Sequence, residues 1–298
     1  MPDAAPASPV PRNDPAFFTE LHRQFKLVVS AEERLVKRML ADYRFVDEDM
    51  GQWAKASLDS RKGLPCLQID RTNGPIRQII NQLASSLPAI KINPVDNGAD
   101  RQKADIRQAL IRHIETESDA EVAKLQAVEH QVKLGRGWWE LVTEWDEDGR
   151  YQTIKFQPVD NPFSIYYDPA CRKADYSDAR FAFHAYDMEP KDYESRFGYE
   201  PPAGLELLRG TGDCAPDWFP DGKIRVCKYF QVTTTWDKKG QAYLERRTVR
   251  CALVDALRIL EEYDIPGPYI PIIPVIGERS NVDGQIDFKG MVRRGKDS

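Results

Sequence analysis

The sequence predicts an α+β fold in which N-terminal helices pack on a mainly antiparallel sheet with long hairpins. Two observations support this class. Apolar residues recur every three or four positions through most of the first 134 residues, and they alternate with polar residues in much of the remainder. Turn residues separate the alternating stretches at short intervals, as expected for strands joined by hairpins. Helices followed by antiparallel strands are typical of the α+β class.

Residues 15–44 are predicted to form one broken helix or two consecutive helices, because their apolar side chains recur at helical spacing. Ser30 followed by Glu33 matches a capping box, in which both side chains bond free backbone N–H groups at a helix start. We therefore expect the break at Ser30. The acidic run at 47–49 is predicted to be a solvated loop and not a metal site, since no spaced set of ligands accompanies it.

Residues 64–96 contain an extended segment, an amphipathic helix and a short strand in immediate succession. Pro75 suits the first helical turn, and Pro88 is expected to stop the helix. The strand is predicted at 90–94, where apolar and polar residues alternate. The helix is indicated by a stripe that we expect to be buried: Ile76, Ile79, Ile80, Leu83 and Leu87.

Residues 99–117 and 118–134 are predicted to form a helix pair. Ser118 and Glu121 match a second capping box, and Gly135 suits the end of the second helix. The first helix carries an apolar stripe at helical spacing: Ile106, Leu110, Ile111 and Ile114.

After Gly135 the apolar period changes from that of a helix to that of a strand. Residues 138–145 and 151–159 are predicted to be antiparallel strands joined by an acidic hairpin turn. A longer hairpin is predicted from strands at 223–236 and 241–251. The other predicted segments are an extended aromatic piece at 161–169, a strand at 181–186, a helix at about 188–198, a helical or irregular piece at 253–262 and a Pro-rich edge strand at 269–278.

Composition limits the class of protein. The chain has 298 residues, of which 41% are hydrophobic, enough for one large domain or two smaller ones. Residues 1–13 are predicted to be a disordered tail, and 14–298 to be the folded region, with a possible internal boundary in the Pro- and Gly-rich loop at 199–222. A formal charge of -5 gives no global basic field for nucleic acid. No membrane helix is expected, because proline interrupts the longest apolar stretch, at 265–277.

Candidate reactive groups have ordinary structural explanations. The five cysteines include no close pair, so neither a disulfide framework nor a zinc cluster is indicated. His113 and His130 lie on different predicted helices without metal-binding neighbours, and His184 lies in an apolar strand. Gly135 and Gly137 do not fit a phosphate-binding motif. We therefore predict no catalytic residue, no metal and no cofactor.

Over residues 34–298 the chain resembles the portal proteins of short-tailed bacteriophages, the connectors between phage head and tail. Seven sequence elements carry the resemblance in order: LPCLQIDR; IRQIINQ with PAIKINPVD; IRHIETESDA; GRGWW; NPFSIYYDP; IPVIGE; and KGMVRRGKD. In that family the last motif leads into the stem helices and the clip. The resemblance therefore implies the N-terminal wing portion alone, with the stem, clip and downstream parts missing.

The resemblance implies a structural protein of a phage or prophage virion. A portal is a ring, usually of twelve subunits, at one capsid vertex, and it assembles in the host cytoplasm. Double-stranded DNA passes through the ring during packaging and ejection, and terminase, scaffold, capsid and tail proteins are its partners. Four basic residues near the C-terminus are candidates for contact with DNA or a neighbouring subunit: Lys289, Arg293, Arg294 and Lys296.

Two other classes of function compete with this interpretation. A metal-dependent hydrolase or nuclease could use the plentiful acidic residues, but the sequence contains neither an HExxH nor a GxSxG motif. A nucleic-acid binding module is disfavoured by the excess of acidic residues and by aromatic residues that alternate as in strands.

Overall fold

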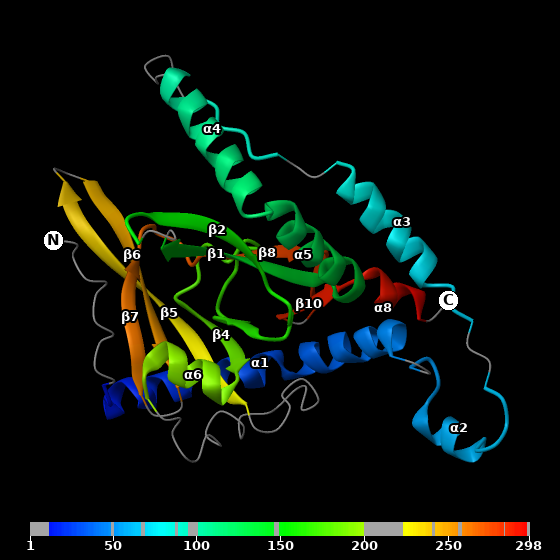
Figure 1. Ribbon diagram of the computed structural model, residues 1–298. Helices are drawn as coiled ribbons and strands as arrows, with labels where there is room; N and C mark the ends of the chain where they lie inside the picture. The colour runs from blue at the N-terminus through cyan, green and yellow to red at the C-terminus, as the bar shows by residue number, and fades with distance from the viewer. Residues whose placement is uncertain are drawn as a thin grey trace. The chain divides into compact units, whose positions relative to one another are not determined.

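The structure, a computed structural model, describes residues 12–48, 51–66, 69–86, 89–94, 101–145, 149–199, 223–239, 242–255, 258–282 and 284–296 (Figure 1). Its N-terminal helices and antiparallel sheets confirm the predicted α+β class. The chain divides into two compact units. Unit 1 comprises Met1–Lys37 and Phe163–Ile270, and unit 2 comprises Arg38–Pro162 and Pro271–Ser298. The first division falls within helix α1 (Pro15–Asp47).

Unit 1 is built on a five-stranded antiparallel sheet in the order β3-β4-β5-β6-β7. The predicted long hairpin is confirmed as the pair β5 and β6. The elements are β3 (Ile165–Tyr167), β4 (Phe181–Met188), α6 (Pro190–Phe197), β5 (Ile224–Lys239), β6 (Ala242–Val254) and β7 (Ile259–Ile265).

The two faces of this sheet pack against different helices. Phe183 and Tyr229 belong to a buried cluster that includes Phe25 of α1. Val226, which points to the other face because successive side chains alternate, packs with Tyr193 of α6. The sheet therefore has an apolar layer on each side, as the strand-like alternation predicts.

Helix α1 is one continuous helix of 33 residues, so the predicted break at Ser30 is wrong. The Ser30 hydroxyl donates to the carbonyl of Leu27 at 2.9 Å and does not cap a new helix. Serine makes this type of bond to the preceding turn inside helices. Val28 and Val29 before the predicted break and Leu35 and Val36 after it are buried, so packing favours continuation of the helix.

Unit 2 contains a three-stranded antiparallel sheet in the order β2-β1-β8 and a separate β9-β10 hairpin. The hairpin of β1 and β2 and the edge position of β8 agree with the predictions. The elements are α2 (Lys55–Ser60), α3 (Asn73–Ala84), α4 (Arg101–Glu117), α5 (Ala120–Leu134), β1 (Arg136–Trp145), β2 (Gln152–Pro158), β8 (Ile272–Ile276), β9 (Glu278–Val282), β10 (Gln285–Lys289) and α8 (Met291–Gly295).

Two glycines allow α5 and β1 to approach their neighbours closely. Gly135 ends α5 with φ of 95°, a conformation that glycine adopts without strain. A Cβ atom at Gly135 would lie 2.6 Å from the backbone of Lys289, and one at Gly137 would lie 1.9 Å from the carbonyl oxygen of Ala127. These glycines therefore serve packing.

The strand predicted at 90–94 is absent: residues 89–94 have no strand assignment. The backbone N–H of Ile92 donates to Oε1 of Gln108 at 2.6 Å, and Nε2 of Gln108 donates to the carbonyl of Ile90. A side chain of α4 thus takes the hydrogen bonds that a neighbouring strand would supply. The helix α3 beside this segment buries Ile76 as predicted, whereas Leu83 is exposed.

One prediction for the helix pair is wrong. The predicted stripe of α4 is covered only at its C-terminal end: Ile114 packs with Ala120 and Phe156, whereas Ile106 and Leu110 are 68% and 56% exposed. The second capping box does not form. The Ser118 hydroxyl donates to the carbonyl of Ile114 and so closes α4, while Asp119 before α5 has φ of 48° and makes no cap bond.

The segment predicted to be helical or irregular, 253–262, is largely strand in its described part, because β6 continues to Val254 and β7 begins at Ile259. Asp255 shapes the reversal between these strands. Its carboxylate accepts the backbone N–H of Arg258 at 2.6 Å and the hydroxyl of Tyr193 at 2.7 Å. The turn depends on this contact with α6, which residue spacing does not reveal.

Several predictions fall on residues outside the described part: most of the tail at 1–13, the acidic turn at 146–148 and nearly all of the loop at 199–222. The possible internal boundary in that loop therefore stays a prediction. Arg12 exchanges two backbone hydrogen bonds with Ile259. Among the helices of the described part of the chain, none is long and apolar enough to cross a membrane.

Candidate functional site

Two of the four basic residues predicted as a contact site, Arg293 and Lys296, contact one buried carboxylate in unit 2. Nε of Arg293 donates to Oδ2 of Asp42 at 2.6 Å, and Nζ of Lys296 lies 2.9 Å from Oδ1 of the same residue. Lys296 also donates to the carbonyl of Ala41 at 2.7 Å. The Asp42 side chain is only 2% exposed, so its charge requires these partners.

The other two basic residues are also held within unit 2. Arg294 is paired with Glu278 at the start of β9. Lys289 is half-buried at the end of β10, beside Gly135. Arg38 adds a further tie, an ion pair of 3.1 Å with Asp287. The structure therefore brings the four predicted residues to one end of unit 2, where at least three of them stabilise the attachment of α8 and the β9-β10 hairpin.

A buried polar group that the sequence did not indicate lies beside this cluster. Arg136 is 1% exposed, and its guanidinium carbon lies 4.9 Å from the ring centroid of Trp138 and 5.5 Å from that of Phe288. Nζ of Lys133 lies 2.9 Å from Oδ1 of Asp47, so this member of the predicted acidic loop is paired and not merely solvated. The sequence does not indicate that Arg136 is buried, because an arginine at the start of a strand is usually a surface residue.

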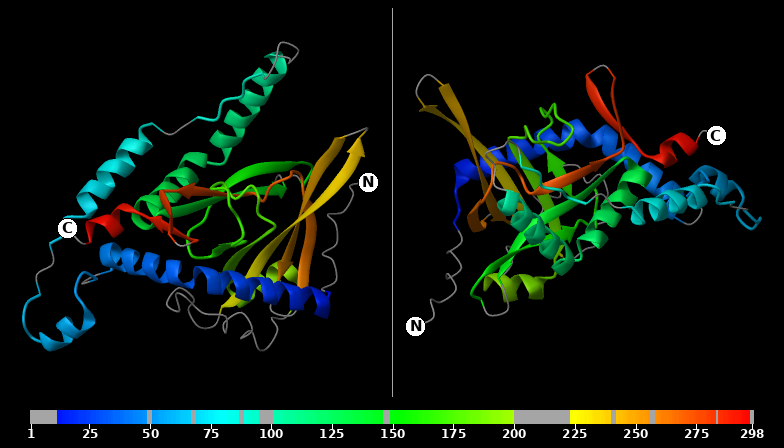
Figure 2. Two further views of the ribbon diagram at one scale, coloured as in Figure 1. Left: turned by 180° about the vertical axis from the view of Figure 1, so that it is seen from behind. Right: turned by 90° about the horizontal axis from the view of Figure 1, so that it is seen from above.

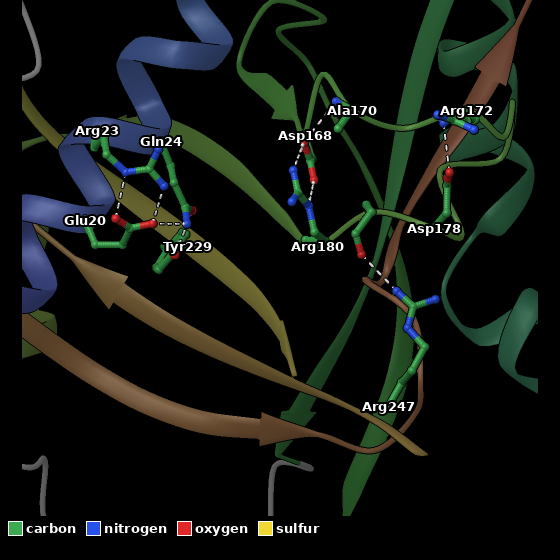
Figure 3. Close-up of polar contacts among 11 residues, drawn as sticks. Glu20, Arg23, Gln24, Asp168, Ala170, Arg172, Asp178, Arg180, Tyr229 and Arg247 are labelled. Carbon is green, nitrogen blue, oxygen red and sulfur yellow. Dashed lines mark hydrogen bonds and ion pairs between the residues drawn. The ribbon is translucent and has the colours of Figure 1, made fainter. Parts of the chain in front are cut away.

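In unit 1 a loop between β3 and β4 is fixed by charged side chains (Figure 3). Arg180 donates to the Asp168 carboxylate through Nε at 2.6 Å and Nη2 at 3.2 Å. Asp178 accepts the backbone N–H of Arg172 at 2.8 Å. Arg247 of β6 donates to the carbonyls of Ser177 and Ala179, the latter at 2.8 Å. Loops of this length without secondary structure are uncommon, and this one is preorganised by its own contacts.

A second polar group in Figure 3 joins α1 to β5. The Glu20 carboxylate accepts from Arg23 and Gln24, and these bonds lower its pKa to about 2. The Tyr229 hydroxyl donates to Oε1 of Gln24 at 2.9 Å, and burial raises the pKa of Tyr229 to about 12. These side chains hold a helix on a sheet.

Three of the described groups with reactive potential are Cys171, Cys227 and His130, and all three are buried. Burial raises the pKa of the Cys171 and Cys227 thiols to about 12, which keeps both protonated and weakly nucleophilic at neutral pH. Burial lowers the pKa of His130 to about 4, so its imidazole is neutral. Within the described residues, no three histidine, cysteine or acidic side chains gather as a metal site would require. The polar contacts of both units position helices, hairpins and loops.

The described contacts define an α+β protein in which ionisable side chains fix secondary elements in place. The chain belongs to the phage P22-like portal protein family, whose match extends over residues 22–298. That family is structural, and the match confirms the resemblance carried by the seven sequence motifs.

A curated relative supports the same family. The chain is 24% identical over 325 residues to a portal protein of Acyrthosiphon pisum secondary endosymbiont phage 1. The aligned region covers 94% of this chain and 45% of the relative, so the chain spans about half the length of the relative it matches.

Proposed function

We propose that the chain is a structural subunit of a phage or prophage portal ring, which sits at one capsid vertex and connects head and tail. The ring provides the channel through which DNA enters during packaging and leaves during ejection. The single observation that carries this proposal is the family match over residues 22–298. The relative named as a portal protein supports it.

In this proposal the protein acts by shape and by contact with copies of itself, with twelve subunits in the ring. Terminase, scaffold, capsid and tail proteins are its partners, and it is carried in the virion after assembly in the host cytoplasm. The rigid loop at 168–180 and the ion pairs around Asp42 support a role in which fixed surfaces matter more than moving groups.

We also propose that the end of unit 2 carrying Lys289, Arg293, Arg294 and Lys296 faces a neighbouring subunit or DNA. Arg294 supports this, because its side chain remains 68% exposed while it is paired with Glu278. Arg293 and Lys296 contribute indirectly by holding α8 against Asp42.

The location can be tested by asymmetric electron cryomicroscopy of particles in which the protein carries a gold-binding tag. The proposal predicts label at one vertex per particle, coaxial with the tail. Label spread over all vertices, or particles without label, would contradict it. An untagged preparation treated with the same gold reagent measures the background.

A further inference from the structure

The outer half of the β5-β6 hairpin extends beyond the rest of its sheet (Figures 1 and 2). Strand β4 pairs with β5 only as far as Gln231, and β7 pairs with β6 only from Val249 onward. Between these limits β5 and β6 pair only with each other in the described part of the sheet. We call this segment, Thr233–Thr248, the arm.

The arm has little to stabilise it within its own unit. A two-stranded ribbon is marginally stable in water, because neither face rests on a core. Thr233, Thr234 and Thr235 are exposed, and the Trp236 side chain is 62% exposed. Both outer edges of the ribbon present backbone N–H and C=O groups that could pair with another chain.

The base of the arm, by contrast, is held firmly. Val249 is buried, and the backbone N–H of Val232 donates to the carbonyl of Arg180 at 2.8 Å. Arg247 donates to two carbonyls of the fixed loop at 168–180, and its guanidinium carbon lies 5.6 Å from the ring centroid of Tyr269. The loop and the base together set the direction in which the arm leaves unit 1.

The charge of the arm is opposite to that of the whole chain. It carries four basic residues against two acidic ones, whereas the chain has a formal charge of -5. A second copy therefore carries a net charge opposite in sign to that of the arm, and complementary charge steers association and fixes orientation. A second copy also offers apolar surface, since Ile106, Leu110 and Val122 are exposed on α4 and α5.

We propose that the arm docks on a second copy of this chain, which completes the stabilisation that its own unit does not provide. This inference rests on the proposed function and adds to it the surface through which neighbouring subunits meet. Open strand edges and an exposed tryptophan favour a protein partner, because a contact with DNA phosphates would need only the basic side chains.

The first test is a shortened arm. Residues 236–245 are replaced by Asn-Gly, which makes a two-residue hairpin turn and leaves Thr235 opposite Arg246, as in the native register. We expect the variant to fold, because the base and Arg247 remain, and to lose assembly in sedimentation velocity experiments. Hydrogen exchange across β4 and β7 checks that the sheet is intact.

The second test changes charge and leaves the arm in place. Lys238→Glu with Arg246→Glu reverses two exposed cations of the arm. The matched control is Lys26→Glu with Lys191→Glu, two exposed lysines of unit 1 outside the arm, with the same change in net charge. We expect self-association to weaken about tenfold in the arm variant and about twofold or less in the control.

The outcomes separate the inference from the proposed function. If the wild type assembles and only the arm variants lose assembly, both the docking role of the arm and the ring proposal are supported. Assembly that persists in the shortened variant overturns the docking role of the arm but leaves the ring proposal standing. A wild type that remains monomeric contradicts both. A wild type that shifts duplex DNA through the arm without self-association assigns the arm to nucleic acid and also overturns the inference.

Discussion

Units 1 and 2 are similar in length but use their apolar residues differently. Among the described residues, unit 1 buries about twice as many apolar side chains as unit 2. In the described part of the chain, fifteen large apolar side chains are exposed, and eleven of them belong to unit 2. The exposed ones in unit 1 are Leu27, Trp236, Tyr263 and Tyr269. Unit 1 is therefore stabilised mainly by its own core, whereas unit 2 leaves surface that further contacts can cover.

The two units also differ in what their buried carboxylates hold in place. In unit 2 a buried carboxylate, Asp42, holds α1 and the C-terminal elements together through Arg293 and Lys296. In unit 1 comparable pairs, such as Asp168 with Arg180, fix a loop beside a sheet that is already packed on both faces. We infer that packing defects will damage unit 1 most, and that charge and backbone clashes will damage unit 2 most.

The largest expected effect is in the core of unit 1. Phe183 is fully buried, with ring centroids of Phe25 and Tyr229 at 5.3 and 4.9 Å. Phe183→Ala should reduce the free energy of unfolding by about 4 kcal/mol, because it leaves a cavity. Phe183→Leu is the control and should cost about 1 kcal/mol. Urea denaturation gives both values, and a loss below about 1 kcal/mol for the alanine variant would show that this core is not decisive.

We expect a smaller loss of folding stability when the buried carboxylate of Asp42 in unit 2 is removed. Asp42→Asn leaves Arg293 and Lys296 without their partner and should reduce the free energy of unfolding by about 3 kcal/mol. Glu33→Gln breaks an exposed pair with Lys37 and should cost less than about 0.5 kcal/mol. Faster hydrogen exchange in α8 should accompany the first change only. Equal effects of the two substitutions would argue against a structural role for Asp42.

His130 should make unit 2 sensitive to acid. Burial lowers its pKa to about 4, so the folded state binds fewer protons than the unfolded state below the ordinary value of 6.5. Stability should therefore fall as pH drops from about 6.5 to about 4, by roughly 3 kcal/mol in total.

The charged neighbours of His130 are Glu129, Lys133, Asp160 and Asp47. Acidification also protonates carboxylates in general, which changes stability independently of His130. The informative measurement is thus the difference in stability between the wild type and His130→Gln as a function of pH. The exposed His113, changed in the same way, is the control. A difference that stays constant between pH 7 and pH 4 would refute the prediction.

The smallest of these effects concerns close backbone contact. Gly137→Ala places a Cβ atom 1.9 Å from the carbonyl oxygen of Ala127 and should cost about 2 kcal/mol, because α5 or β1 must shift. Gly74→Ala, in a helix with no atom within 4 Å of the new Cβ, should be neutral or stabilise by up to about 0.5 kcal/mol. Thermal melting compares the two, and the prediction fails if they melt alike.

The local sequence pattern was sufficient to predict those elements whose contacts are made between residues close together in the sequence. The β1-β2 and β5-β6 hairpins and the end of α5 at Gly135 are of this kind. It failed where a distant contact decides the conformation. Gln108 replaces a strand partner for Ile90 and Ile92, and the sheet of unit 1 keeps α1 continuous through Ser30.

The contacts of the candidate site could not be predicted for the same reason, because they join residues far apart in the sequence. The sequence places Arg293 and Lys296 in a basic segment, but their shared partner Asp42 lies more than 250 residues earlier in the chain. Spacing cannot reveal such a pair. Arg136 was missed because an arginine at a strand start reads as exposed, whereas here two aromatic rings cover it.

Assembly of this chain into the proposed ring can be measured by native mass spectrometry of the purified chain, combined with electron microscopy of the same sample. We expect a discrete species of twelve subunits that appears as a closed ring. A monomer at every concentration tested, or a continuous distribution of aggregates without rings, would refute the proposed assembly.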